Sequence, residues 1–233
     1  MKKIKDASLI QYYIEMFSLD HYVEHQFYQE IQIYELQPGE ILCEQEQMAN
    51  YMYFLCKGKV KIFTLSEAGK RLVVAFNQSP EVFGDIEYVQ HNAYMNTIEA
   101  LTPSHVMKIP FTLFSILEKL HPEILHFLLE SVTRKFYTKS KTLSFHLLNE
   151  VDVRLASYLL SITTGENGEE RDILSKYELR EIAEFIGTSS RHLNRVIKDF
   201  AEKKIVQREH GSLLILNRQA LIEKACGNVY EIQ

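Results

Sequence analysis

The sequence predicts an α+β protein with an N-terminal antiparallel β-roll, a long helix and a C-terminal winged helix-turn-helix. Three observations carry this prediction. The hydrophobic period is close to two between residues 31 and 109, and it is helical without interruption between residues 122 and 149. Residues 174–206 then hold two short helical patterns separated by a glycine. The predicted domains are residues 1–118 for the β-roll, 119–150 for the long helix and 151–233 for the C-terminal unit.

The composition suits a cytoplasmic protein. With 233 residues, 46% of them hydrophobic, the chain can form one large or two modest cores. There is no run of about 18 apolar residues that would span a membrane. The basic N-terminus lacks the long apolar segment and the cleavage site of a signal peptide. The three cysteines are widely separated and form no CxxC pair, so a reducing compartment is expected.

The first half of the chain predicts one helix followed by many short strands. The helical pattern covers residues 8–28. The strand-like runs after it are separated by turn residues such as Pro38-Gly39 and Ser79-Pro80. Many short strands at such spacing predict a closed or sandwich-like antiparallel structure. The runs are residues 41–43, 51–56, 59–65 and 72–76.

The long helix is predicted from about Pro122 to Asn149. Its apolar residues step by four and three, as in a heptad repeat, with two polar interruptions. One neighbour cannot cover such a row, so pairing with the same helix of a second chain is predicted. The alternative is that the helix packs only on its own β domain. The row consists of Leu125, Leu129, Val132, Phe136, Lys139, Leu143 and His146.

The helix-turn-helix pattern has a clear break and a clear restart. Gly187 ends the first helix, and the side chain of Ser189 can cap the second. A helix over residues 151–162, a hairpin over residues 206–216 with its turn near His210-Gly211, and a closing helix over residues 218–225 complete a winged helix. The apolar stripe of the first helix is Leu179, Ile182, Ala183 and Ile186, and that of the second is Leu193, Val196, Ile197 and Phe200.

The polar face of the second helix is suited to DNA. It offers two arginines and an amide near its start, and these side chains can bond guanine and adenine edges in a major groove. The net charge of −5 opposes this, but residues 189–204 hold five basic and two acidic side chains, and DNA responds to the local potential. The alternative is a solvated face paired with nearby acids. The predicted DNA-binding residues are Ser189, Ser190, Arg191, His192, Asn194, Arg195 and Lys198; Lys203 and Lys204 are phosphate contacts or plain surface charges.

The succession of these parts resembles the cyclic-AMP receptor protein and FNR family of bacterial transcription regulators. The likeness covers nearly the whole chain. It rests on QPGEIL (37–42), YMYFLCKGKVKIF (51–63), EAGKRLVVAF (67–76), EVFGDIEYV (81–89) and ELREIAEFIGTSSRHLNRVIKDF (178–200). The last segment is most similar to a YeiL-like branch. The resemblance implies a homodimer that binds a palindromic operator in double-stranded DNA and recruits or blocks RNA polymerase.

The resemblance also assigns roles on the second helix. It implies that Arg195 contacts guanine. Ser190 and Arg191 stand where the cyclic-AMP receptor protein has an arginine–glutamate pair, so the operator is expected to differ from the one that protein reads.

Cyclic nucleotide binding is not expected. Relatives that bind it hold the phosphate with a Gly-Glu pair and a following Arg-Ser or Arg-Thr pair. Here Asp85 follows Gly84, and Tyr94 and Met95 stand where the arginine and serine belong. No arginine occurs between residues 71 and 134, so a buried phosphate would lack its charge partner.

Three interpretations of the β-roll remain open. It binds another small effector, it is filled by its own side chains and acts without an effector, or it holds haem through His91 or His21. No cofactor is predicted. The candidate effector-binding residues are Phe83, Gly84, Asp85, Tyr94, Met95 and Asn96.

A cupin-like metal enzyme is the alternative from another class. Such sites need clustered histidines with a carboxylate, whereas the β region offers only His91 and His105 and no HxH pair. GxSxG, P-loop and HExxH motifs are absent as well. The sequence therefore predicts no catalytic or metal-binding residue, and Cys43 and Cys56 are expected to be small core residues of strands.

Overall fold

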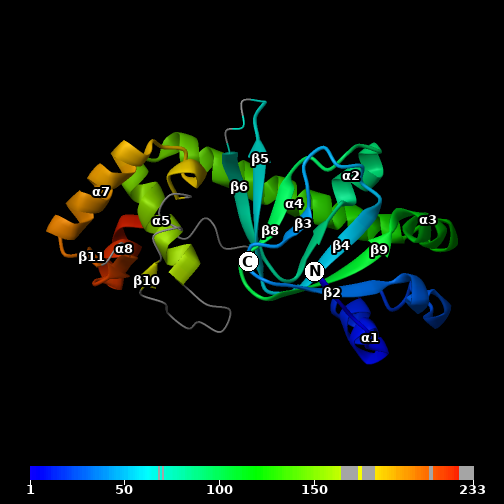
Figure 1. The fold of residues 1–233 in the computed structure, drawn as a ribbon. Coiled ribbons are helices and arrows are strands. Elements are labelled where there is room, and N and C mark those ends of the chain that lie inside the picture. Colours follow the sequence, from blue (N-terminus) through cyan, green and yellow to red (C-terminus); the bar gives the residue numbers. More distant parts are fainter. Residues whose placement is uncertain (68, 70, 164–172, 175–181, 210–211, 226–233) are drawn as a thin grey trace. The chain divides into compact units, whose positions relative to one another are not determined.

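The computed structural model describes residues 1–67, 69, 71–163, 173–174, 182–209 and 212–225. The chain divides into two compact units, Met1–Arg134 and Lys135–Gln233. The boundary falls within the longest helix, α4 (Ile124–Leu148), which therefore begins in the first unit and ends in the second (Figure 1).

Two antiparallel sheets form the first unit. One has five strands in the order β1-β2-β9-β4-β7, and the other has four in the order β3-β8-β5-β6. This arrangement confirms the predicted β-roll, and each of the four predicted strand-like runs is a strand. The strands are β1 (Lys2–Ile4), β2 (Gln32–Leu36), β3 (Ile41–Cys43), β4 (Tyr51–Lys57), β5 (Lys59–Leu65), β6 (Arg71–Gln78), β7 (Glu81–Phe83), β8 (Thr97–Ala100) and β9 (Ser104–Pro110).

Apolar side chains cover both faces of the five-stranded sheet. One face, with Val106, contributes to a cluster between the two sheets. The other face, with Met107, packs against α1 (Ala7–Met16), α3 (Phe111–Leu120) and the start of α4. Adjacent residues of one strand reach different cores because successive side chains of a strand point to opposite faces.

The N-terminal helix is shorter than predicted. One helix was expected over residues 8–28, but α1 ends at Met16. Ser18 has a φ of 54°, a left-handed conformation that interrupts a helix. A separate 3₁₀ helix, His25–Glu30, follows. The bend brings Leu19 into the same helix-side core, so tertiary packing overrides the local helical pattern.

α4 presents two different sides. Ile124 and Leu128 are buried in the core of the first unit. Of the row predicted from the sequence, Leu129, Phe136 and Leu143 face outward with exposed fractions of 62%, 71% and 61%. Val132 and His146 of the same row are half-buried. Among the residues that the structure describes, no helix is long and apolar enough to cross a bilayer.

The second unit is a winged helix in its described part. Its small sheet has the order β10-β12-β11, and β11 and β12 form the predicted hairpin. Residues 182–185 are helical, which agrees with the first helix of the predicted pair. Leu179, the hairpin turn at His210-Gly211 and Cys226 lie outside the described residues. The other elements are α5 (Val151–Thr163), β10 (Ile173–Leu174), α7 (Ser190–Glu202), β11 (Val206–Glu209), β12 (Ser212–Ile215) and α8 (Arg218–Ala225).

Candidate nucleic-acid interface

The turn before α7 is closed by backbone hydrogen bonds. The N–H of Gly187 donates to the carbonyl of Glu184 at 3.3 Å, and the N–H of Thr188 donates to the carbonyl of Ala183 at 2.9 Å. This is the Schellman pattern, in which a left-handed residue ends a helix. Gly187 supplies that residue with a φ of 66°. The predicted helix break is therefore confirmed.

Ser189 caps α7 as predicted. Its Oγ accepts a hydrogen bond from the backbone N–H of His192 at 3.2 Å. Ser190 and Arg191 then form the first turn of the helix, where backbone N–H groups have no partner within the helix. These groups and the helix dipole make this end of α7 favourable for an anion such as a phosphate.

Arg154 of α5 braces the same turn, and the sequence reasoning missed it. Its Nη1 donates to the carbonyl of Ile186 at 2.6 Å. Among the described residues its buried Nε has no hydrogen-bond partner, so the hydrogen bond from Nη1 is what fixes the guanidinium at this turn. No local signal distinguishes Arg154 from a surface arginine, because its partner lies 32 residues further along the chain.

The apolar stripe of α7 is buried, which turns the opposite side of the helix outward. Leu193, Val196, Ile197 and Phe200 are each at most 8% exposed. α7 contacts α5 and β11. Of the predicted DNA-binding residues, His192 is half-buried, and Ser189, Ser190, Arg191, Asn194, Arg195 and Lys198 are exposed.

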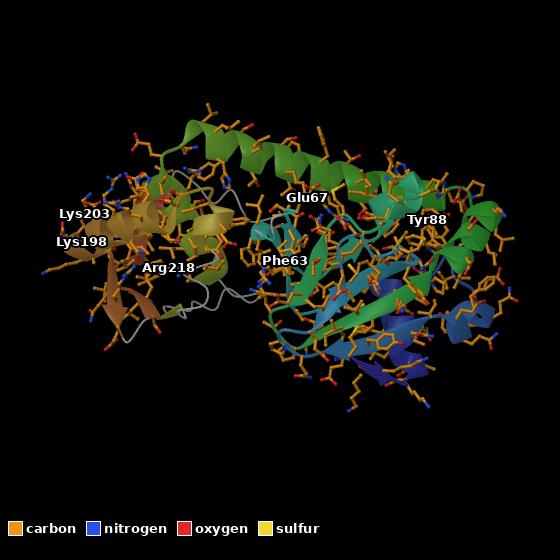
Figure 2. The ribbon with its side chains drawn as sticks, turned by 45° about the horizontal axis from the view of Figure 1, so that its top comes forward. Phe63, Glu67, Tyr88, Lys198, Lys203 and Arg218 are labelled. Atoms are coloured by element: carbon orange, nitrogen blue, oxygen red, sulfur yellow. The ribbon has the colours of Figure 1, made fainter. Side chains whose placement is uncertain are left out.

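The basic side chains of α7 fall into two groups. Lys198 lies 3.7 Å from Glu202, and Lys203 lies 2.7 Å from Asp199, so both have acidic neighbours on the helix. These lysines extend from the surface of α7 (Figure 2). Arg191 and Arg195 form no ion pair with any residue in the described ranges. The alternative of a face paired with acids therefore fits the lysines but not the two arginines.

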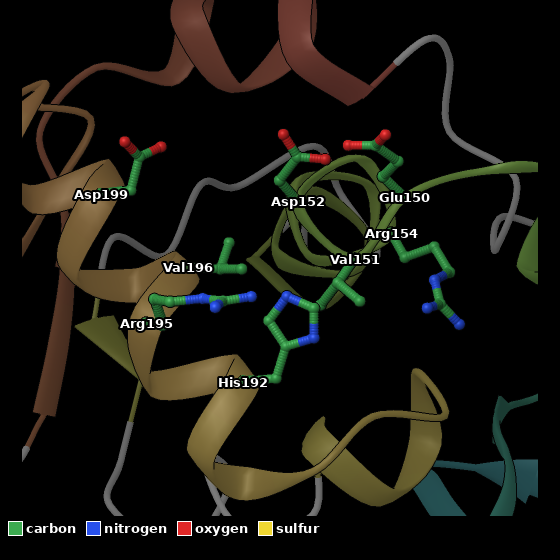
Figure 3. Close-up of a pocket in the computed structure, with 8 residues that line it drawn as sticks. All are labelled: Glu150, Val151, Asp152, Arg154, His192, Arg195, Val196 and Asp199. Carbon is green, nitrogen blue, oxygen red and sulfur yellow. The ribbon is translucent and has the colours of Figure 1, made fainter.

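An open pocket of about 640 Å³ lies where α7 meets the start of α5. Arg195 and His192 extend from α7 toward Val151 (Figure 3). Two of its carboxylates already have cationic partners: Lys224 lies 2.5 Å from Asp152, and Lys203 lies beside Asp199. The lining residues are Glu150, Val151, Asp152, Arg154, His192, Arg195, Val196 and Asp199.

Arg208 is a second residue that the sequence reasoning missed. It lies on β11, and its Nη2 donates a short hydrogen bond to the Oδ1 of Asn194 on α7. Both side chains are exposed. The wing strand therefore adds a guanidinium beside the predicted DNA-binding residues. The alternation of the strand, with Val206 buried, could have indicated this placement.

In the β-roll, the Gly84–Asp85 step is tightly constrained. Gly84 has a φ of 87°, and a Cβ there would lie 2.6 Å from the carbonyl oxygen of Tyr51. Asp85 begins the short helix α2 (Asp85–Gln90) and is 1% exposed. Its carboxylate accepts a hydrogen bond from the hydroxyl of Ser131 on α4 at 2.9 Å. This aspartate thus contacts the long helix.

Tyr94 fills part of the space between the sheets. Its hydroxyl donates to the carbonyl of Tyr51 at 2.8 Å, and its N–H donates to the carbonyl of Gln47 at 3.0 Å. Its ring lies 6.0 Å from that of Tyr53, and both rings belong to the same buried cluster as Phe83. Burial raises the pKa of Tyr53 to about 12 and that of Tyr94 further, so both stay neutral.

The structure does not gather all six candidate effector residues. Phe83 and Tyr94 share the inter-sheet cluster, whereas the side chain of Met95 is 59% exposed. Asn96 uses its backbone carbonyl to accept a weak hydrogen bond from the thiol of Cys43. Cys43 and Cys56 are free and buried, as expected for core residues of strands.

Two lysines of the sheets could also offer a positive charge to a phosphate, but the ammonium group of each already has a partner within the protein. Lys61 is 3% exposed and donates to Glu99 at 3.3 Å. Lys108 lies on the same face of β9 as Val106, and its Nζ is 3.5 Å from the ring centroid of Tyr51. Burial lowers the pKa of Lys108. A cation over an aromatic face is stabilised without an anion.

The comparisons with known proteins agree with this architecture. A family model for the cyclic nucleotide-binding domain matches residues 34–117, and a model for the Crp-like helix-turn-helix domain matches residues 153–224. The cAMP-activated global transcriptional regulator CRP of Pasteurella multocida is 23% identical over 177 residues, which cover 73% of this chain and 82% of that protein. The global nitrogen regulator of Synechococcus elongatus is 23% identical over 201 residues, which cover 83% of this chain and 90% of that protein.

A solved structure shows the same fold. It is that of a CRP-family transcriptional regulator from Thermus thermophilus, with a TM-score of 0.69 and 19% identity over 84% of this chain and 98% of that chain. The fold and the two domain matches define a transcription regulator with a cyclic-nucleotide-binding-type β-roll and a DNA-binding helix-turn-helix. The chain belongs to the CRP/FNR family. The nearer likeness to a YeiL-like branch stays a prediction.

Proposed function

We propose that two copies of this chain pair through α4 and bind a palindromic operator in double-stranded bacterial DNA, in the cytoplasm, to recruit or block RNA polymerase. The observation that supports the reading of DNA bases is that the side chains of Arg191 and Arg195 are exposed and have no ion-pair partner in the described part of the chain. They lie on a helix whose other side is buried, so their guanidinium groups are available to base edges and phosphates.

The outward row of α4 supports the homodimer. Leu129, Phe136 and Leu143 are each more than 60% exposed and recur at heptad spacing on one side of the helix. The same helix is already buried in its own unit through Ile124 and Leu128. The outward row is therefore a separate apolar surface, and its heptad spacing is complementary to an identical helix.

The β-roll supports an effector other than a cyclic nucleotide. Tyr94 stands where the resemblance places the phosphate-binding arginine, and its polar atoms are bonded to the backbone of the roll. Asp85, which stands where relatives that bind a cyclic nucleotide have the glutamate, accepts a hydrogen bond from Ser131 of α4. Lys61 and Lys108 are engaged by Glu99 and Tyr51. An effector that displaces the contact between Asp85 and Ser131 would act directly on α4.

An effector-independent regulator is the second candidate. The observation that favours it is the inter-sheet cluster, in which Tyr53, Phe83 and Tyr94 are buried together. The interior of the roll would then act only as a core between the two sheets. Operator affinity measured with and without a metabolite extract of the host separates the candidates, because only the effector-controlled protein changes its affinity.

The test of DNA reading is Arg195→Ala on an operator selected from genomic DNA by the purified protein. Loss of a bidentate arginine contact should weaken cognate binding by about 1–3 kcal/mol and relax one base position. Lys198→Ala is the comparison on the same helix: a lysine with Glu202 beside it can contact only phosphate, so its loss should weaken cognate and scrambled duplexes alike. An equal loss by Arg195→Ala on cognate and scrambled duplexes would contradict base reading by Arg195.

A further inference from the structure

The wing strand supplies a side chain to the DNA-reading helix. Nη2 of Arg208, on β11, donates to Oδ1 of Asn194, on α7. In the described part of the chain this is the one polar contact of Arg208. Asn194 is flanked on α7 by Arg195 and, one turn earlier, by Arg191. The contact thus lies within the predicted DNA-binding face.

The pleat of β11 explains why Arg208 reaches α7. Side chains two residues apart lie on the same face of a strand, so Arg208 shares a face with the buried Val206. β11 contacts α7, and this face is therefore the one turned toward the helix. Gln207 lies on the opposite face. Pairing of Arg208 with Leu213 of β12 fixes the register.

The chemistry of the two groups determines how the amide is oriented. A guanidinium has only N–H donors, so the atom that faces it must be the amide oxygen of Asn194 and not the nitrogen. Rotating the amide by a half turn would place two sets of donors against each other. Arg208 therefore leaves the Nδ2 donors of Asn194 for a ligand. On a base edge their partner is an acceptor such as purine N7 or thymine O4.

We infer that Arg208 is a positioning residue for sequence recognition, which fixes the amide of Asn194 so that it donates to an acceptor on one base edge. This inference rests on the proposed DNA reading by α7. It predicts that the wing and the recognition helix specify one base position jointly. Truncating Arg208 should then have the same effect on specificity as truncating Asn194, although the two residues lie 14 positions apart in the chain.

The test is sequence selection from a randomised operator by the full-length protein and its variants. Arg208→Ala and Asn194→Ala should both relax the same base position, by about 5-fold or more in relative preference. The double variant should relax it no further, because the two residues act as one unit. Arg208→Lys keeps a donor and should restore part of the preference. Gln207→Ala, on the opposite face of β11, should leave it unchanged.

The outcomes separate this inference from the proposed function. If Arg208→Ala weakens all sequences alike and the position read by Asn194 keeps its preference, Arg208 is a phosphate contact and the inference is wrong. The inference also fails if the two single variants relax different positions. If the wild-type protein itself selects no sequence, sequence-specific DNA binding is wrong. Circular dichroism of each variant shows whether a lost preference is due to unfolding.

Discussion

At the scale of single residues, two glycines show how surroundings decide the consequence of one backbone conformation. Gly39 and Gly84 have φ values of 86° and 87°. A Cβ at Gly39 would meet nothing within 4 Å, whereas one at Gly84 would lie 2.6 Å from the carbonyl oxygen of Tyr51. Both substitutions incur the left-handed penalty, but only the second also forces backbone apart.

We therefore expect Gly39→Ala to lower the free energy of unfolding by about 1–2 kcal/mol. Gly84→Ala should lower it by about 1–3 kcal/mol more, because the carbonyl of Tyr51 has to move. Urea unfolding of both variants measures the difference. Equal losses would show that the β7–α2 corner adjusts freely and is not constrained by β4.

His146 is the residue whose titration should affect the second unit. Burial, followed by the charge of Arg154, lowers the pKa of His146 below its usual value near 6.5. Its ring packs edge-on against Phe185 at 6.0 Å. The folded protein thus favours the neutral ring of His146. Its contribution to the free energy of unfolding is complete above the pKa that His146 has in the unfolded chain, and it is lost as the pH falls below that pKa.

The urea concentration at the unfolding midpoint should therefore decrease as the pH is lowered from 7 to 5. His146→Leu should make this decrease smaller. The pKa of His105 is also lowered, by burial first, so some dependence should remain in that variant. His105→Leu is the matched variant in the first unit. An unchanged pH dependence in His146→Leu would show that His146 does not couple protonation to stability.

At the scale of elements, α4 connects the two units, and different residues along it make different contacts. Its first turns are buried in the β-roll core, Ser131 bonds Asp85, and the outward apolar row remains for a partner. Contact between α2 and α4 through Asp85 gives a physical route from the β-roll to the helix. Asp85 is thereby a link between elements in addition to a candidate ligand residue.

Phe136→Glu should convert the proposed dimer into a monomer. Phe136 is 71% exposed in the single chain, so the change should not unfold it, but it would place two charges at an apolar contact. Light scattering after size exclusion at micromolar concentration measures the mass. Ile116→Glu, at an exposed apolar residue of α3, is the control and should leave the mass unchanged. A dimeric Phe136→Glu would exclude this row as the interface.

At the scale of the whole molecule, the relation between the family's ligand and this β-roll can be measured by linkage. A ligand at 100 times its Kd stabilises the folded state by about 2.7 kcal/mol. We expect millimolar cyclic AMP to leave the thermal midpoint of this protein unchanged, because the groups that would hold its phosphate are replaced or occupied. CRP of Pasteurella multocida, a cAMP-activated regulator by its name, is the positive control. A raised midpoint would contradict the proposed effector chemistry.

The sequence predicted those features that depend on local periodicity and local chain geometry. The strands of the β-roll, the helix break at Gly187 and the cap at Ser189 follow from alternation, backbone conformation and side-chain chemistry within a few residues. The helix over residues 8–28 was wrong in extent, because burial of Leu19 requires a bend that the periodicity does not encode.

The sequence by itself therefore determined the fold class, the family and the position of the recognition helix. Only the tertiary structure decided which polar groups are already occupied: Asp85 by Ser131, Asn194 by Arg208, and the carbonyl of Ile186 by Arg154. The physical reason is distance along the chain. Periodicity is set by neighbours a few residues apart, whereas each of these hydrogen bonds joins residues 14 to 46 positions apart, which only folding brings together.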